Sequence, residues 1–156
     1  SPKNVIFLTC DALGVMPPVS RLTPEQAMYH FISGYTSKVA GTEMGIVDPV
    51  STFSACFGEA FLPLHPYQYA EMLAEKCEKH NAKVWLINTG WVRGSFGVGK
   101  RMNLTQTRAI IDSIHDDSLD MSKTNTMRRF QLQVPETVFG VDPEILRPID
   151  CWPDRE

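Results

Sequence analysis

The segment from Lys83 to Asn88 reads KVWLIN, a short apolar run bounded by polar residues. Such a run predicts a β-strand that is covered on both faces. A second run of this kind, KNVIFLTC, extends from Lys3 to Cys10, and weaker patterns predict strands at Ser51–Phe57 and Phe130–Val134. Helical patterns lie between these runs, and strands that alternate with helices are typical of the α/β class. The proline-rich last twenty residues are expected to be mostly irregular.

Three helices are predicted from start and stop signals. The clearest start is Thr23-Pro24-Glu25-Gln26, which has the residues of a capping box with proline at the first helical position. Gly34 is expected to end this helix. A second helix should run from His65-Pro66 to Asn81, and a third should begin with Thr105 as its N-cap residue.

Composition limits the classes of function. The chain has 156 residues, which suggests one domain with a hydrophobic core. A net charge of -3 argues against nucleic acid as a partner, and no apolar run approaches the length that crosses a membrane. The cysteines form no C-x-x-C pair, which argues against zinc and disulfides and favours a reducing cytosol. They are Cys10, Cys56, Cys77 and Cys151.

The stretch from Gly94 to Arg101 nearly matches a phosphate-binding P-loop. Gly94 and Gly99-Lys100 have the required spacing, but Arg101 stands where the motif needs a Ser or Thr hydroxyl to bind the magnesium ion of the nucleotide. A guanidinium has no lone pair for a metal, so Arg101 cannot replace that hydroxyl. Three interpretations remain: a phosphate cradle, a flexible connection between a strand and a helix, or a loop in which Arg101 stacks on a base.

Two further groups have residue types that bind metals. Asp11 follows an apolar strand, as a magnesium-binding aspartate does in nucleotide enzymes. The alternative is a turn residue whose carboxylate accepts hydrogen bonds from the nearby backbone. His115-Asp116-Asp117 lies at a predicted helix end, where polar residues are common and a histidine complements the helix dipole. For this cluster we favour a solvated helix end.

Several segments, taken together and in order, closely resemble the ATP-dependent phosphoenolpyruvate carboxykinases. The resemblance runs from Lys3 to about Pro148 and rests on KNVIFLTCDALGVMPPVSRLTPEQAMYHFISGYTSKVAGTE, TFSACFGEAFLPLHP, LINTGW, GVGKR and TRAIIDSIH. It implies a carboxy-lyase that converts oxaloacetate and ATP to phosphoenolpyruvate, ADP and CO2 with Mn²⁺ and Mg²⁺, in gluconeogenesis and in the cytoplasm. The implied fold is part of a P-loop-like mononucleotide-binding carboxykinase domain, with a mixed sheet and flanking helices.

The resemblance also assigns a role to the glycine-rich stretch. In this family the pattern GKR-x5-T lies on the adenosine side of the ATP site, and here it corresponds to Gly99-Lys100-Arg101 followed by Thr107. Arg101 and Met102 are therefore expected to border the adenine, and Thr107 to contact the nucleotide. The family often has Ile at the position of Met102, which exchanges one apolar side chain for another.

The same resemblance places residues 1–156 in the C-terminal part of the ATP-binding domain. The loop from Gly41 to Pro49 corresponds to a mobile lid, in which Met44 is expected to have no catalytic role. The family's P-loop, metal ligands and substrate-binding arginines belong to upstream segments, so Asp11 loses its metal role and no catalytic residue or metal ligand is expected here. The isolated chain should therefore be inactive. It should also be poorly stable, because the apolar strands Lys3–Cys10 and Lys83–Asn88 are expected to have neighbours on both edges, some of them in the upstream segment. The alternatives are another ATP-dependent phosphotransferase and a non-catalytic fragment that associates with other chains.

Overall fold

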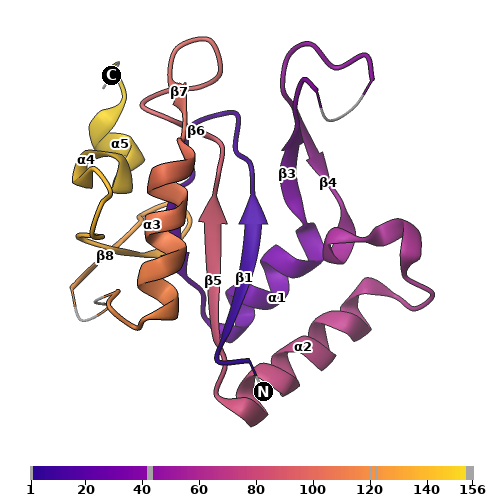
Figure 1. Ribbon diagram of the computed structural model, residues 1–156. Helices are drawn as coiled ribbons and strands as arrows, with labels where there is room; N and C mark the ends of the chain where they lie inside the picture. The colour runs from indigo at the N-terminus through magenta and orange to yellow at the C-terminus, as the bar shows by residue number, and fades with distance from the viewer. Residues whose placement is uncertain (1, 42–43, 120, 122, 154–156) are drawn as a thin grey trace.

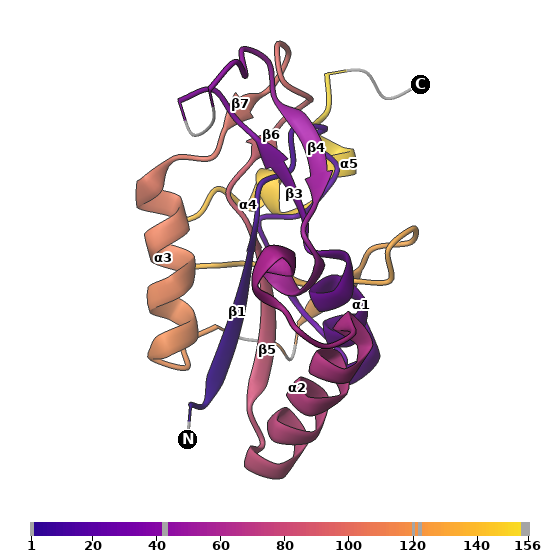
Figure 2. The same cartoon turned by 90° about the vertical axis from the view of Figure 1, so that its right-hand side faces the viewer.

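The computed structural model describes residues 2–41, 44–119, 121 and 123–153. A five-stranded sheet has the order β1-β5-β2-β9-β8 and carries helices on both faces (Figure 1 and Figure 2). β1 and β5 are parallel, whereas the other neighbouring strands are antiparallel, which confirms the α/β class and the mixed sheet. The strands are β1 (Asn4–Thr9), β2 (Val19–Arg21), β5 (Lys83–Asn88), β8 (Thr124–Thr126) and β9 (Gln133–Pro135).

The two apolar runs quoted above form the parallel pair β1 and β5. They align without offset, from Asn4 opposite Lys83 to Thr9 opposite Asn88. β5 has a neighbouring strand on each side, whereas β1 lies at one edge of the sheet that the structure describes. Both strands were expected to have neighbours on both edges. β5 has them, whereas β1 has one neighbouring strand among the described residues.

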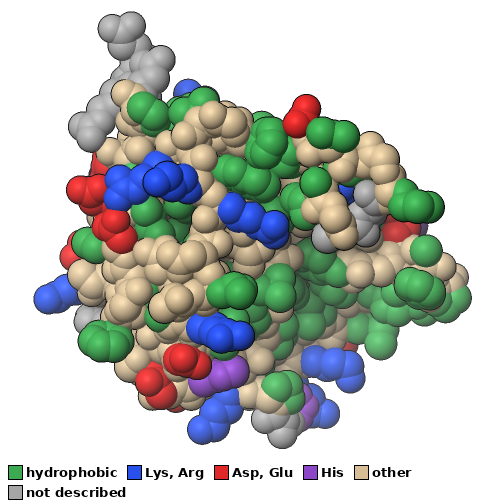
Figure 3. Space-filling model, turned by 45° about the horizontal axis from the view of Figure 1, so that its top comes forward, with side chains coloured by type: hydrophobic (Ala, Val, Ile, Leu, Met, Phe, Trp, Pro, Cys, Tyr) green, Lys and Arg blue, Asp and Glu red, His purple; other side chains and the backbone are tan. Residues whose placement is uncertain are grey.

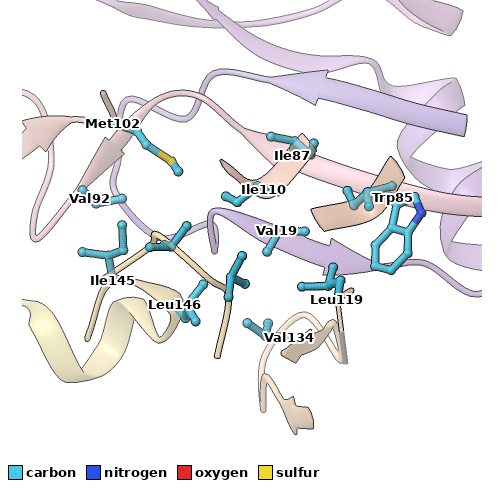
Figure 4. Close-up of a cluster of buried hydrophobic side chains, with 13 residues drawn as sticks. Val19, Trp85, Ile87, Val92, Met102, Ile110, Leu119, Val134, Ile145 and Leu146 are labelled. Atoms are coloured by element: carbon cyan, nitrogen blue, oxygen red, sulfur yellow. The ribbon is translucent and has the colours of Figure 1, made fainter. Parts of the chain in front are cut away.

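Side chains along β5 alternate between two hydrophobic clusters, one on each face of the sheet. Val84 and Leu86 pack toward α1 (Pro24–Ser33) and α2 (Pro66–His80). Trp85 and Ile87 pack toward α3 (Leu104–His115), on the opposite face in Figure 2. Figure 4 shows the second cluster, in which residues from α3 and α4 (Pro143–Leu146) pack on residues from β5, β2 and β9 of the sheet. This burial on both faces explains why β5 has no polar alternation in its sequence.

The expected ends of α1 and α2 are confirmed. The Thr23 hydroxyl accepts a hydrogen bond from the Gln26 backbone amide at 3.2 Å, and the Gln26 side chain accepts one from the Thr23 amide at 3.0 Å. Gly34 and Asn81 end the two helices in the left-handed conformation, with φ of 51° and 54°. No helix in the described ranges is long and apolar enough to cross a membrane.

The predicted start of α3 is wrong by two residues. Asn103, not Thr105, is the N-cap residue, and its side chain accepts a hydrogen bond from the Gln106 amide at 2.8 Å. Both residue types cap helices well, so the sequence pattern alone does not separate them. Asn103 is favoured in the structure because the Met102 amide is still bonded to the Gly90 carbonyl, which ends the extended segment just before the helix.

Two predicted strands are shorter than expected because of backbone conformation. β4 (Val50–Phe53) ends before Cys56 and Phe57, whose positive φ values of 53° and 58° do not fit a strand. A strand beginning at Phe130 is likewise interrupted by Gln131, which has a φ of 54°, so β9 begins only at Gln133.

The remaining elements are short. β4 pairs with β3 (Tyr35–Lys38), and β6 (Trp91–Val92) pairs with β7 (Lys100–Arg101), so that two hairpins stand beyond one end of the sheet (Figure 1). The last twenty residues are less irregular than expected, because prolines at the first helical position begin α4 and α5. The other short elements are η1 (Ala55–Phe57), η2 (Glu59–Phe61) and α5 (Pro148–Cys151).

Candidate functional site

The carboxyl ends of β1 and β5 lie side by side, so the two segments that follow these strands begin at the same end of the sheet. The hairpins β3–β4 and β6–β7 stand above this edge in Figure 1. In open α/β sheets, ligands bind in the crevice beyond the carboxyl ends of the strands. Figure 3 shows this end of the molecule, where basic side chains lie beside hydrophobic ones.

Asp11 lies directly beyond β1, and its side chain is completely buried. Its carboxylate accepts hydrogen bonds from the amides of Leu13 (2.9 Å), Val15 (2.7 Å) and Met16 (2.8 Å) and from the hydroxyl of Tyr35 (2.9 Å). A carboxylate has about four lone-pair positions, so these donors occupy its capacity. The interpretation of Asp11 as a turn residue is thereby confirmed.

Asn88 ends β5 and joins the two strand ends. Its side-chain oxygen accepts hydrogen bonds from the amides of Asp11 (2.9 Å) and Gly90 (2.8 Å), and its side-chain amide donates to the Met16 carbonyl (3.0 Å). A Cβ atom at Gly90 would overlap the backbone of Asp11, so glycine is required for this close approach. The segments that follow β1 and β5 therefore form one rigid platform at the carboxyl ends of these strands.

Three backbone amides of the glycine-rich turn between β6 and β7 donate hydrogen bonds to carbonyl groups of the protein itself. The Phe96 amide donates to the Ala12 carbonyl at 2.8 Å, and the amides of Val98 and Gly99 donate to the Ser95 carbonyl at 3.0 and 2.7 Å. In a P-loop, by contrast, free amides at a helix start converge on the phosphates.

The element that follows this turn is a strand. Lys100 and Arg101 form β7, and α3 begins only at Leu104. The described turn therefore lacks the helix start at Gly-Lys, and three of its amides, those of Phe96, Val98 and Gly99, are already bonded within the protein. Of the three interpretations of this stretch, the phosphate cradle is the one that the geometry opposes.

Arg101 is held above an aromatic ring. It lies opposite Trp91 in the β6–β7 pair, and its guanidinium carbon is 5.7 Å from the centre of the Trp91 ring. Its Nε donates to the Thr89 carbonyl at 3.3 Å, and the edge of the Phe96 ring packs on Trp91 with centroids 5.4 Å apart. Because Arg101 is exposed, the guanidinium face away from Trp91 is accessible to a ligand. This planar cation is suited to stack on a base.

The other two predicted nucleotide-binding residues are more enclosed. Met102 is 7% exposed, and its side chain points into the hydrophobic cluster of Figure 4. Thr107 is 8% exposed and lies in α3, where its hydroxyl donates to the Asn103 carbonyl at 3.1 Å. The structure thus brings Arg101 and Met102 to one strand end, but Arg101 is exposed and Met102 is buried.

Trp91 is the residue of this site that the sequence analysis missed. Its position two residues before a glycine-rich turn carries no motif, and only the pairing of β6 with β7 places it beneath Arg101.

A second neighbour of Arg101 is Cys10. Burial raises the pKa of the Cys10 thiol, and the positive charge of Arg101 opposes that shift.

The cluster at the end of α3 is a helix end, as expected. The Asp116 carboxylate accepts a hydrogen bond from the Ser118 amide at 2.9 Å, and Asp117 forms an ion pair with Lys83 at 2.8 Å. Among the residues that the structure describes, no group of three or more His, Cys, Asp and Glu side chains could hold a metal ion.

Comparison with known proteins gives a consistent result. The family model described as phosphoenolpyruvate carboxykinase matches residues 1–144. The chain is 58% identical over 155 residues to "Phosphoenolpyruvate carboxykinase (ATP)" of Sulfurimonas denitrificans and 58% identical over 155 residues to the protein of the same name from Dictyostelium discoideum. It is 59% identical over 156 residues to the one from Candida glabrata.

These alignments cover 99% of the chain but only 28% to 29% of each relative. The chain therefore spans less than a third of the length of the curated relatives it matches. Both the family model and the identities extend across the strands, the glycine-rich turn and α3. The chain belongs to the ATP-dependent phosphoenolpyruvate carboxykinase family.

Proposed function

We propose that these residues are part of an enzyme that converts oxaloacetate and ATP to phosphoenolpyruvate, ADP and CO2. In this proposal residues 1–156 are the C-terminal part of a P-loop-like ATP-binding domain, and they provide the adenosine side of the ATP site and a lid. We further propose that this enzyme acts in gluconeogenesis and is located in the cytoplasm. The observation that supports it most directly is the exposed guanidinium of Arg101, held above Trp91 at the carboxyl end of the sheet.

The Arg101 site fits an adenine base better than a phosphate group. The cation–π contact and the bond to the Thr89 carbonyl restrain the guanidinium, so less side-chain freedom remains to be lost when a base stacks on it. Met102 would contribute backbone and the apolar boundary of the base pocket, because its side chain is nearly buried. Thr107 would contribute through the first turns of α3, where its position is fixed by the bond to Asn103.

We assign the lid to the loop that joins β3 and β4, residues 41–49, of which Thr42 and Glu43 lie outside the described residues. Gly41 and Gly45 have φ of 85° and 83°, a conformation that glycine adopts without strain. Met44 and Val47 expose 103% and 79% of their surface, so apolar side chains are available to cover a ligand. Closure of such a loop would exclude water from phosphoryl transfer.

In this proposal Mn²⁺ and Mg²⁺ are held by the upstream part of the enzyme, as the family resemblance implies. When bound, these ions would offset the negative charge of the ATP phosphates. The role left to this chain is to orient adenosine and to exclude water. The proposed partners are thus ATP and ADP, oxaloacetate and phosphoenolpyruvate, CO2, and the upstream part of the same enzyme.

Replacement of Arg101 by alanine in the full-length enzyme tests this function. The KM for ATP should rise by a factor that corresponds to about 1–3 kcal/mol, since a stacking contact is lost. The KM for oxaloacetate should stay nearly constant. Arg108→Ala is the matched control, because Arg108 is an exposed arginine of α3. An unchanged KM for ATP in Arg101→Ala would contradict the adenine assignment.

Two assays separate this function from the alternatives. Release of ADP that depends on both oxaloacetate and metal distinguishes a carboxykinase from another ATP-dependent phosphotransferase. Residues 1–156 alone should release no ADP, because the proposal places the P-loop and the metal ligands in the upstream part of the enzyme. Metal-dependent turnover by this chain alone would contradict the division of roles proposed here, whereas absence of turnover in the full-length protein would favour a non-catalytic fragment.

A further inference from the structure

The hairpin β3–β4 is a separate two-stranded sheet beside the carboxyl end of β1. An isolated two-stranded hairpin is marginally stable in water, so its orientation depends on what fastens its base. The Thr9 hydroxyl donates to the Tyr35 carbonyl at 2.6 Å, and the Cys10 amide donates to the Thr36 hydroxyl at 3.2 Å. The Tyr35 hydroxyl donates to the buried Asp11 carboxylate at 2.9 Å.

The bond between Tyr35 and Asp11 is the one that reaches the platform of the candidate site. The other donors to this carboxylate are amides of the segment that follows Asp11 itself, whereas Tyr35 belongs to a different element. Burial, reinforced by the negative charge of Asp11, raises the pKa of the Tyr35 hydroxyl. The hydroxyl therefore remains protonated and able to donate around neutral pH. A hydrogen bond to a buried charge is also stronger than one between neutral groups.

Asp11 continues this connection toward Arg101. Its carbonyl accepts a hydrogen bond from the Trp91 amide at 2.8 Å, and Trp91 supports the guanidinium of Arg101. Asp11 therefore joins two elements. Its side chain bonds to Tyr35 at the base of the hairpin, and its carbonyl bonds to Trp91 in β6, which pairs with the strand that carries Arg101. Asp11 also bonds to Asn88 and to its own loop, and these bonds restrain it from moving separately from them.

We infer that Tyr35 is a positioning residue that couples the β3–β4 hairpin, through Asp11, to the nucleotide side of the site. Its hydroxyl touches neither substrate nor nucleotide in this inference. It holds the base of the hairpin in the orientation from which the loop closes. The inference rests on the proposed function, since it assumes that nucleotide binds near Arg101 and that the loop of this hairpin is the lid.

Hydrogen exchange of the full-length enzyme tests the coupling. In Tyr35→Phe, amides of residues 35–38 and 50–53 should exchange about tenfold faster, because a bond to a charged group is lost from the base of the hairpin. ATP should slow this exchange in the unaltered enzyme, and that protection should be largely lost in Tyr35→Phe. Tyr29→Phe is the matched control, because Tyr29 is 67% exposed on α1.

Kinetics and direct binding give the second measurement. The kcat of Tyr35→Phe should fall several-fold while the dissociation constant for ATP stays close to that of the control, since the hydroxyl does not contact the nucleotide. Equal protection of the hairpin by ATP in Tyr35→Phe and in Tyr29→Phe would overturn the inference. So would an unchanged kcat together with faster exchange, because the hairpin would then be loosened without effect on turnover. Failure of the unaltered enzyme to bind ATP would instead contradict the proposed function.

Discussion

Gly94 and Gly99 of the β6–β7 turn lie closely against neighbouring residues of that turn and of β6, whereas the glycines of the proposed lid have open space around them. A Cβ atom at Gly99 would overlap the carbonyl oxygens of Val92 and Gly94. At Gly41 and Gly45 it would meet no described atom within 4 Å. The first segment needs glycine because backbones approach closely, and the second uses it for a left-handed conformation in a loop.

This contrast indicates how each segment can act. The turn holds Arg101 in one position, because its amides bond to Ser95 and to Ala12 of the neighbouring segment. Gly41 and Gly45 have no such packing around them, which is the freedom that the proposed lid would need to close. A rigid contact for the base and a movable cover are the two components that the proposed function requires of this chain.

The largest effect is expected from Gly99→Ala. The added methyl group would force two backbone carbonyls apart, and the free energy of unfolding should fall by about 3 kcal/mol in urea denaturation of the full-length protein. Gly97→Ala is the control in the same turn. Gly97 has a φ of 88° and no described atom within 4 Å of its added Cβ, so it should cost only the conformational strain of about 1–2 kcal/mol. Similar losses in both variants would show that the turn is not tightly packed.

Shortening the lid comes next. Deletion of residues 44–47 should lower kcat by about 10- to 100-fold, because closure completes the site after the substrates have bound. The dissociation constant for ATP, measured by equilibrium titration, should change by less than about twofold, since ground-state binding does not need the cover. Equal losses in kcat and in ATP affinity would mean that the loop is a binding or structural element.

Trp91→Leu sharpens the role of the rigid segment. Loss of the cation–π contact should raise the KM for ATP by about 2- to 5-fold, which corresponds to ~0.5–1 kcal/mol. Trp91→Phe should restore most of the affinity, because it retains an aromatic face for Arg101. Steady-state kinetics with oxaloacetate in excess measures both variants. A KM for ATP that rises equally in the leucine and phenylalanine variants would argue that Trp91 acts through packing alone.

The smallest effect on stability is expected from Gly45→Ala. A side chain at a φ of 83° is strained, as at Gly97, but no described atom lies within 4 Å of the added Cβ, so the cost should be about 1 kcal/mol, the backbone strain alone. The melting temperature of the full-length protein should therefore move far less than in Gly99→Ala. A loss as large as that of Gly99→Ala would place Gly45 in a packed environment and remove the contrast between the two segments.

Local interactions explain which features could be predicted from the sequence. The bounds of β5 are those of KVWLIN, because a strand covered on both faces leaves a continuous apolar run. The ends of α1 and α2 were also predictable, since the capping box and the left-handed Gly34 and Asn81 involve only near neighbours. The resemblance to the carboxykinases, confirmed by the family match, extended the prediction to function.

The short strands and the environment of Arg101 depended on distant partners. Arg101 and Trp91 are ten positions apart and meet only because β6 and β7 pair, and no motif records that pairing. The sequence by itself determined the parallel strands β1 and β5, the ends of α1 and α2, and the family. The tertiary structure alone decided that Asp11 is a buried junction and that Met102 faces the core. The reason is that burial and hydrogen-bond partners of a side chain are properties of the packed chain, to which Tyr35 and Asn88 contribute from far along the sequence.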